Sequence, residues 1–314
     1  MKFFAMLAVL LLRNFYGQNL TLPLDKAFSS WQAYIAKRLK QGMGSSAVFL
    51  LSSMPWVLLL WLLLWWLDGI YWYLPVLGLH LLVVFYALGR RCDLVWVNRY
   101  MTAWRQADYE AAGYYAAEIL DEPINNISDK ELHARVVSRL VVFAFDRLFL
   151  VLFWYLLLGP MGALMARLTE QAIFNARRAN NLQQEEGEIE SKEAVAPLSC
   201  CAEQVIRFQQ VMEWPAARLM GLTLGLTGRP WLGLRQFAVD IFRWKLSSEV
   251  FLNRQLVTGY GLLSGSAVSK STYYQRQVMI TEAADDELLA LRERVWRSLA
   301  VWVAVTAVGV IFWF

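Results

Sequence analysis

The sequence predicts an all-α, polytopic membrane protein with about four or five hydrophobic segments and amphipathic cytoplasmic helices. Of its 314 residues, 58% are hydrophobic and 18% are charged, whereas soluble domains average about half and a quarter. The apolar residues are concentrated in a few long blocks, as in membrane-spanning helices. The net charge of +4 is too balanced for a nucleic-acid binder. The three cysteines provide no disulfide framework.

The first region, residues 1–88, begins with a short apolar segment. Residues 1–12 resemble a signal peptide, but no small-residue cleavage motif follows them, so we expect an uncleaved anchor. Residues 20–41 have apolar residues at helical spacing and four Lys/Arg on the other faces. This pattern predicts a basic amphipathic helix, either on the cytoplasmic membrane surface or packed on the rest of the protein.

A helical hairpin is predicted next. Residues 47–67 and 70–88 are uncharged, and Asp68-Gly69 forms the turn between them. Lys and Arg flank both outer ends of the hairpin and are missing from its turn, which places the turn outside and both flanks in the cytoplasm. His80 lies within the second helix, where packing or an interhelical hydrogen bond is a more common role than ligand binding.

Residues 89–135 are polar and amphipathic, which predicts a cytoplasmic helix or helix pair. The region 136–228 follows as a membrane core. Its uncharged segment 148–166 either crosses the membrane completely or breaks at Gly159-Pro160 and re-enters, since proline tends to break helices. Within this core, the acidic stretch 182–203 predicts a flexible loop.

The end of the membrane core and the last region are less apolar. Residues 214–228 predict a short helix in which Gly221 and Gly225 allow close packing. Region 229–314 consists of basic amphipathic helices followed by an uncharged C-terminal anchor over 298–314. These features favour a multi-pass protein with the lipid bilayer as its main partner.

Catalytic motifs are missing from the sequence. It contains only two histidines, His80 and His133, so we predict neither a histidine metal site nor a Ser-His-Asp triad. The sequence predicts no catalytic residue or metal ligand, and it does not identify a cofactor. Enzymatic activity is left open at this point.

Three stretches resemble the CobD/CbiB family of membrane-bound adenosylcobinamide-phosphate synthases. They are FWYLLLGPMGALMAR at 153–167, EWPAARL at 213–219 and ADYEAA at 107–112. Their order and spacing agree with the family over about residues 85–230. Polar residues that the synthases carry are replaced here by apolar Val142, Phe143 and Ile173. The resemblance therefore argues against that synthase activity.

The sister AmpE family is the better match, because its resemblance extends to LGRRCD at 88–93 and to the anchor that begins at 297. It implies a regulatory or sensory modulator of the bacterial inner membrane, linked to β-lactamase induction and cell-wall recycling. Two alternatives stay open. One is a diverged CobD/CbiB-type synthase that forms an amide or phosphate ester on an anionic substrate, and the other is a structural partner of a membrane complex.

Five charged residues lie in or beside the matching segments. They are Asp146, Arg167, Glu170, Glu213 and Arg218. Charges near hydrocarbon are costly, so we expect these residues to neutralise one another or a bound ligand. Arginine suits an anionic group, and Glu213 could orient Arg218 at a helix start formed by Trp214-Pro215. The two interpretations are a set of structural ion pairs and a binding site for an anionic small molecule.

A homo-oligomer or a membrane partner protein is also compatible with this sequence.

Overall fold

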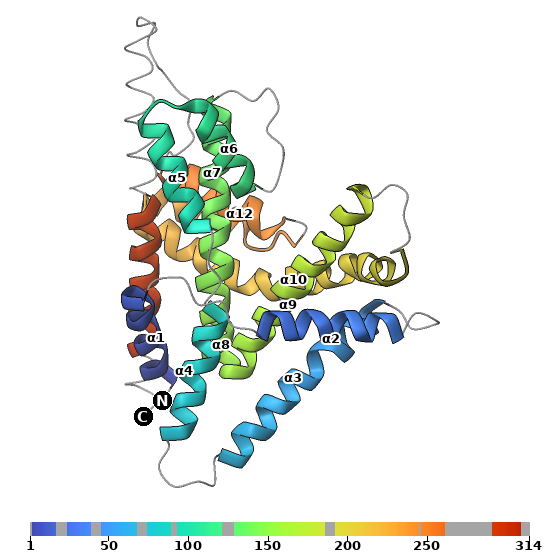
Figure 1. Cartoon of the computed structure of the whole chain (residues 1–314). Coiled ribbons are helices and arrows are strands. Elements are labelled where there is room, and N and C mark those ends of the chain that lie inside the picture. The colour runs from blue at the N-terminus through green and yellow to red at the C-terminus, as the bar shows by residue number, and fades with distance from the viewer. Residues whose placement is uncertain are drawn as a thin grey trace, which may run out of the picture. The chain divides into compact units, whose positions relative to one another are not determined.

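The computed structural model describes residues 2–16, 24–38, 45–67, 74–88, 93–120, 129–185, 192–244, 246–260 and 291–308. All regular elements in these parts of the chain are helices, which confirms the all-α prediction for them (Figure 1). The predicted turn at Asp68-Gly69 and the charged stop at Gly89-Arg91 lie outside the described residues.

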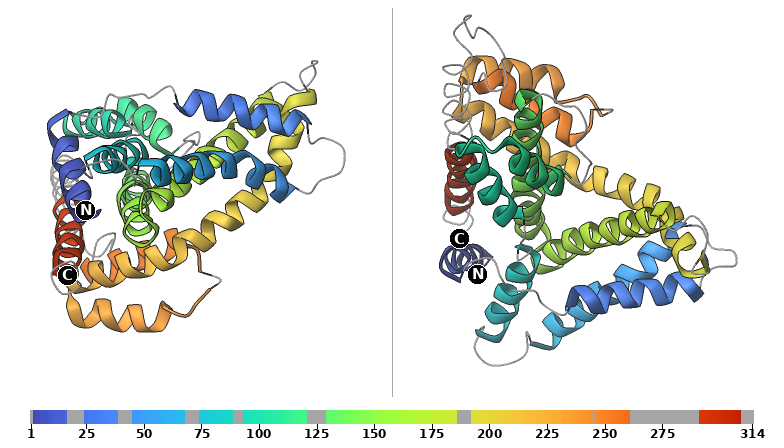
Figure 2. Two further views of the ribbon diagram at one scale, coloured as in Figure 1. Left: turned by 90° about the horizontal axis from the view of Figure 1, so that it is seen from below. Right: turned by 45° about the horizontal axis from the view of Figure 1, so that its top comes forward.

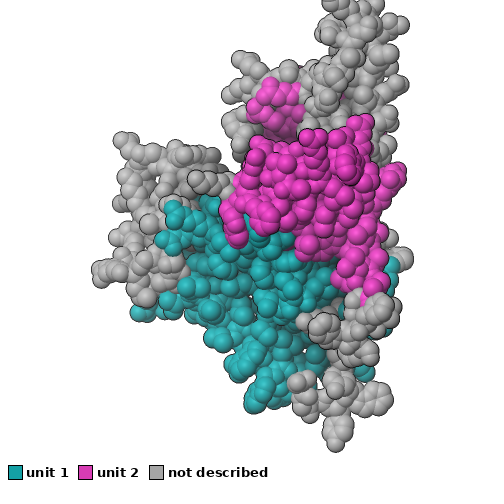
Figure 3. All heavy atoms as spheres, turned by 180° about the vertical axis from the view of Figure 1, so that it is seen from behind, with its two compact units in different colours: residues 1–90, 150–215 teal, residues 91–149, 216–314 magenta. Residues whose placement is uncertain are grey.

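The chain forms two compact units (Figure 3). Unit 1 comprises residues 1–90 and 150–215, and unit 2 comprises residues 91–149 and 216–314. Both units are discontinuous in sequence, because the chain leaves unit 1 after residue 90 and returns to it at residue 150.

Unit 1 is arranged around helix α9. Its helices are α1 (Lys2–Tyr16), α2 (Leu24–Arg38), α3 (Ser45–Leu67), α4 (Leu74–Leu88), α8 (Leu150–Leu158), α9 (Pro160–Glu185) and the first part of α10 (Lys192–Thr227). Helix α9 packs against α2, α3, α4 and α8, while α1 packs against α4 and α8 (Figure 2). This arrangement brings α2 and α9 together, although they are distant in sequence.

Helix α2 confirms the helix expected over 20–41, and its contacts distinguish between the two expected locations of that helix. It packs on α3 and α9, so it follows the alternative in which the helix packs on the rest of the protein. Its buried stripe is Phe28, Gln32 and Ala36, and Trp31 and Ile35 of the expected apolar face are only partly buried. The buried stripe therefore contains a polar residue, which indicates a specific partner for it on a neighbouring helix.

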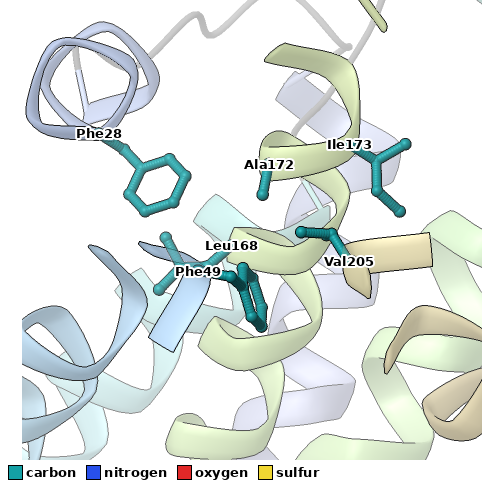
Figure 4. Close-up of a cluster of buried hydrophobic side chains, with 6 residues drawn as sticks. All are labelled: Phe28, Phe49, Leu168, Ala172, Ile173 and Val205. Atoms are coloured by element: carbon teal, nitrogen blue, oxygen red, sulfur yellow. The ribbon is translucent and has the colours of Figure 1, made fainter. Parts of the chain in front are cut away.

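The apolar core beside α2 is formed from four helices. Figure 4 shows the cluster of Phe28 on α2, Phe49 on α3, Leu168, Ala172 and Ile173 on α9, and Val205 on α10. All six side chains are buried. Burying this apolar surface joins the N-terminal helices to the α9–α10 segment.

Unit 2 contains α5 (Asp93–Arg105), α6 (Tyr109–Leu120), α7 (Asp129–Ala144), the π-helix η1 (Phe145–Phe149), the end of α10, α11 (Pro230–Asp240), α12 (Ser248–Tyr260) and a helix over 291–308. Helices α5 and α6 pack against each other and α6 packs on α7, which confirms the helix pair predicted within 89–135. The chain turns between α5 and α6 at Ala107, whose φ is 56°, and Asp108 accepts a hydrogen bond from the Ala111 amide.

The third apolar block ends at the predicted break. Helix α8 ends at Leu158, Gly159 has a φ of 70°, and α9 begins at Pro160. Residues 148–166 are therefore not one continuous helix, which confirms the break at Gly159-Pro160, and the re-entry of this segment into the membrane stays a prediction. A side chain at Gly162 would collide with the Trp154 carbonyl, so glycine is required for α9 to approach α8 this closely.

Two predictions for residues 182–228 are wrong. The stretch expected to be a loop is helical on both sides, because α9 continues to Glu185 and α10 begins at Lys192. Its Glu, Gln, Lys and Ala residues have high helix propensity. Helix α10 also continues through Trp214-Pro215, so that dipeptide does not begin a helix. One proline removes one backbone donor, and the buried Ala216 and Ala217 that follow it hold the helix by packing.

Two described helices are long and apolar enough to cross a membrane, namely Phe49–Leu67 and Glu131–Leu158. This classification is based only on the length and the amino-acid composition of the helices. The first agrees with the span predicted over 47–67, and the second begins earlier than the predicted 148. Helix α4 is apolar but shorter. The expected anchor over 298–314 is helical as far as residue 308, beyond which it lies outside the described residues.

Candidate functional site

A buried arginine in unit 1 joins two carboxylates from different helices. Nη1 of Arg167 lies 2.8 Å from Oε2 of Glu170, one turn later on α9, and Nη2 lies 2.8 Å from Oδ2 of Asp25 on α2. The Tyr86 hydroxyl on α4 donates to the other Asp25 oxygen at 2.8 Å. The Arg167 guanidinium carbon also lies 5.5 Å from the Tyr86 ring centre. We call these four residues the Arg167 cluster.

The electrostatics of the Arg167 cluster follow from its burial. Burial alone would lower the pKa of Arg167, but Glu170 and Asp25 outweigh this effect, so the pKa is raised and the guanidinium stays charged. The cluster therefore joins one guanidinium to two carboxyl groups. The side chains of Asp25 and Glu170 are 31% and 29% exposed, whereas Arg167 is 2% exposed. The outer surface of the cluster is therefore carboxylate, which disfavours an anionic ligand.

Polar contacts continue along α2 and α9 beyond the Arg167 cluster. Ser29 donates to Oδ1 of Asn175 at 3.1 Å, and the Asn175 amide donates to Oε1 of Gln32 at 2.7 Å. The Gln171 amide donates to the same Asn175 oxygen at 3.4 Å. We call Ser29, Gln32, Gln171 and Asn175 the α2–α9 polar ladder. It gives buried Gln32 the partner that its position requires.

Arg218 occupies a different environment, in unit 2. Its Nε donates to the Ile241 carbonyl at 3.2 Å and its Nη2 to the Arg243 carbonyl at 3.1 Å. Helix α11 ends at Asp240, so Arg218 binds carbonyls at the C-terminal end of that helix. Its guanidinium carbon lies 3.9 Å from the Phe251 ring centre. Burial lowers the pKa of Arg218, and nearby Asp240 opposes that shift.

The structure brings together only part of the predicted set. Arg167 and Glu170 form an ion pair. Glu213, partly buried on α10, belongs to the same unit, whereas Asp146 on η1 and Arg218 belong to unit 2. The convergence of all five residues on one ligand, and the orientation of Arg218 by Glu213, stay predictions. The contacts of Arg167 fit the interpretation as structural ion pairs, whereas the described hydrogen bonds of Arg218 are to backbone carbonyls.

Asp25, Tyr86, Gln171 and Asn175 were not predicted as site residues. Asp25 lies within the helix expected over 20–41, where its four basic residues determined the interpretation. Acidic residues are common in the first turn of a helix, so Asp25 alone did not indicate a partner distant in sequence. The polar residues that follow Arg167 at helical spacing, Gln171 and Asn175, are the one signal that could have revealed a polar stripe on α9.

The two histidines have similar partners in the two units. In unit 1, Nδ1 of His80 on α4 lies 3.0 Å from the Tyr155 hydroxyl on α8, which confirms the interhelical hydrogen bond expected for it. In unit 2, Nδ1 of His133 lies 3.0 Å from the Tyr100 hydroxyl. Within the described parts of the chain, no group of three or more His, Cys, Asp or Glu side chains is arranged to hold a metal ion.

Comparison of the chain with protein-family models, curated proteins and solved structures found no match. The resemblance to the AmpE and CobD/CbiB families therefore rests on the quoted sequence motifs, and the assignment of function rests on them together with the geometry above.

Proposed function

We propose that the protein is a multi-pass protein of the bacterial inner membrane that modulates β-lactamase induction and cell-wall recycling, as its resemblance to the AmpE family implies. The observation that carries the membrane assignment is the exposure of α3. Only 17% of its most apolar window is buried, and Leu59, Trp65 and Trp66 are exposed. An apolar helix with this much exposed surface is stable when lipid covers it.

The regulatory assignment is supported by the way in which the buried arginines are used. Both terminal nitrogens of Arg167 bind carboxylates of the same chain, and Arg218 binds backbone carbonyls. A synthase acting on an anionic substrate needs cationic groups directed at that substrate. These contacts, together with Val142, Phe143 and Ile173 in place of the synthase's polar residues, favour a modulator over the diverged-synthase alternative.

The membrane assignment is tested with reporter fusions. Alkaline phosphatase fused after Gly69 should be active, and the same reporter fused after Asp93 should be inactive, because the hairpin turn is proposed to face outward. The opposite pattern would invert the proposed topology. Activity at neither site, with stable fusion protein, would exclude the hairpin.

The regulatory assignment is tested in a bacterium with an inducible chromosomal β-lactamase and no AmpE-type protein of its own. Expression of this chain should change the ratio of induced to basal β-lactamase activity. An unchanged ratio at normal protein abundance would reject the proposal. Rescue of an adenosylcobinamide-phosphate synthase mutant growing on cobyric acid would instead establish the synthase alternative.

Two variants separate the structural and ligand-binding interpretations of the predicted residues. Glu170→Ala and Arg218→Ala are scored for both abundance and induction, with Lys26→Ala, an exposed α2 residue, as the matched control. Normal abundance with altered induction would support a ligand site. Reduced abundance would support a structural role, which the ion pairs of Arg167 and the backbone hydrogen bonds of Arg218 lead us to expect.

A further inference from the structure

Helix α11 in unit 2 has an outer face that is almost entirely apolar. The exposed residues of this α11 outer face are Trp231, Leu232, Leu234, Arg235, Ala238, Val239 and Phe242. Trp231 is 83% exposed and Phe242 is 80% exposed, and Trp244 just beyond them is 67% exposed. Large aromatic side chains are seldom left this exposed on a soluble surface, so their clustering indicates a covering partner.

The opposite face of α11 fixes the helix to unit 2. Gly233 lies against Gly225 of α10, where an added Cβ would come within 2.6 Å of the Gly225 Cα. Phe237 packs on Phe251 of α12 with ring centres 6.2 Å apart. Arg218 binds the carbonyls at the end of the helix. These contacts hold α11 in one orientation, so its outer face points away from α10 and α12. The close crossing of α10 and α11 requires glycine.

The exposed charges between positions 229 and 244 are all positive. Arg229, Arg235 and Arg243 are exposed, and the single acidic residue between positions 229 and 244 is Asp240. Asp240 is fully buried, with Arg243 Nη1 at 3.1 Å and Arg254 Nη1 at 3.6 Å. Exposed tryptophan and arginine side chains here provide hydrogen-bond donors and no side-chain acceptor. This chemistry is complementary to a layer of phosphate oxygens.

We propose that α11 lies in the plane of the membrane–water interface and selects anionic phospholipids. Trp231, Val239 and Phe242 insert between the acyl chains, while the arginines bind the phosphates of the headgroups. Apolar and aromatic residues on one face of a helix, with basic residues beside them, are the composition of interfacial helices, and tryptophan favours this depth. The inference rests on the proposed membrane location and adds a second mode of membrane contact to the spanning helices.

The test places a fluorophore on the outer face of the full-length protein in lipid vesicles. Cys92, Cys200 and Cys201 are replaced by serine, and an environment-sensitive dye is attached to Val239→Cys. Two controls carry the same dye. Leu59→Cys reports insertion of α3, and Glu110→Cys lies on the exposed surface of α6, away from the apolar patch. Quenching is measured with spin-labelled phospholipids and, separately, with a water-soluble quencher.

The expected result is quenching of the dyes at 239 and 59 by spin-labelled lipid, with the dye at 110 quenched only from water. Quenching at 59 without quenching at 239 would overturn the inference and leave the membrane location intact. Lack of lipid quenching at both positions would overturn both proposals. A dye at 239 that is protected from both quenchers would mean that protein covers the face, and it would also overturn the inference.

A charge-removal variant tests the selection of anionic lipid. Anionic spin-labelled lipid should quench the dye at 239 more strongly than zwitterionic lipid at the same fraction, because each arginine should favour anionic lipid beside it by about fivefold. Arg229→Gln/Arg235→Gln should reduce this preference to the part that Arg243 sustains. Lys26→Gln/Lys37→Gln removes two exposed charges from α2 and should preserve it. If both double variants lose the preference for anionic lipid equally, the preference comes from the overall charge, and the proposed contacts between these arginines and phosphates would be wrong.

Discussion

Arg167 in unit 1 and Arg218 in unit 2 are both buried, at 2% and 4% exposure, and each lies over an aromatic ring. They differ in the groups that their nitrogens bind. Arg167 binds two carboxylates, whereas Arg218 binds two neutral backbone carbonyls. Burial lowers the pKa of both arginines, but at Arg167 the carboxylates of Glu170 and Asp25 outweigh it and the pKa is raised, whereas the pKa of Arg218 stays lowered.

This difference separates two roles for a buried cation. Arg167 neutralises charges that would otherwise repel each other between α2 and α9, so its loss leaves partly buried carboxylates without their counterion. Arg218 donates to two carbonyls just beyond α11, so its loss leaves neutral acceptors, while nearby Asp240 keeps its ion pairs with Arg243 and Arg254. The removal of the first arginine should therefore destabilise the fold more than the removal of the second.

The largest effect is expected for Arg167→Met. It should lower the free energy of unfolding by about 3 kcal/mol, because Asp25 and Glu170 lose their shared counterion. Thermal and chemical unfolding of the purified protein in detergent measures the loss. The double variant Arg167→Met/Asp25→Asn should recover part of it. A single variant as stable as the wild type would remove the distinction between the two arginines.

The next effect is expected for Gly233→Ala, which breaks the crossing that brings α11 to Arg218. The new methyl group would meet the Gly225 backbone at 2.6 Å, and overpacking of this kind should cost about 2 kcal/mol of unfolding free energy. Gly113→Ala on α6 is the matched control, because nothing lies within 4 Å of its added Cβ. The control should be neutral or stabilising, as alanine is the better helix former. Equal losses in both variants would show that the effect is not specific to the close crossing of α10 and α11.

Arg218→Met should have a smaller effect, about 1 kcal/mol, since its hydrogen-bond acceptors are neutral carbonyls and nearby Asp240 retains ion pairs with Arg243 and Arg254. The change should be local. Hydrogen exchange of the amides between Phe237 and Arg243 should become faster, while amides of α9 in unit 1 should keep their rates. Faster exchange throughout unit 1 would show that Arg218 supports more than the end of α11.

The smallest effect is expected for Arg297→Gln, which breaks an ion pair with Glu293 at 3.0 Å. This distance is close to that of the Arg167 pairs, but both side chains are more than 60% exposed. Exposed pairs contribute little, so the unfolding free energy should change by less than about 0.5 kcal/mol. A loss as large as that of Arg167→Met would show that burial is not what distinguishes the pairs.

Helix positions follow well from local sequence patterns in this protein. The apolar run at 47–67 predicted the helix whose segment Phe49–Leu67 is long and apolar enough to cross a membrane, and Gly159-Pro160 predicted the break between α8 and α9. Gly221 and Gly225 predicted close packing, and both glycines do lie against neighbouring helices. These features depend on residues within a few positions of one another, so they can be recognised without tertiary structure.

The candidate site was less predictable, because its contacts join distant parts of the chain. The Arg167–Glu170 pair follows from helical spacing, but Asp25 is 142 residues away from Arg167. Arg218 was assigned to an anion or to Glu213, whereas its described partners are main-chain carbonyls. A backbone carbonyl partner cannot be recognised from the sequence, since every residue has a backbone carbonyl.

The α2–α9 polar ladder limits how many alignments the two helices can adopt. A purely apolar contact surface tolerates a small rotation or slide, because the attraction between apolar groups has little directional character. Amide and hydroxyl groups bond only over a narrow range of distance and angle. A shift of α2 by one residue would bury Gln32 away from Asn175, its partner at 2.7 Å. We therefore expect recognition between α2 and α9 to depend on matched amides, as a single buried asparagine selects one pairing in coiled coils.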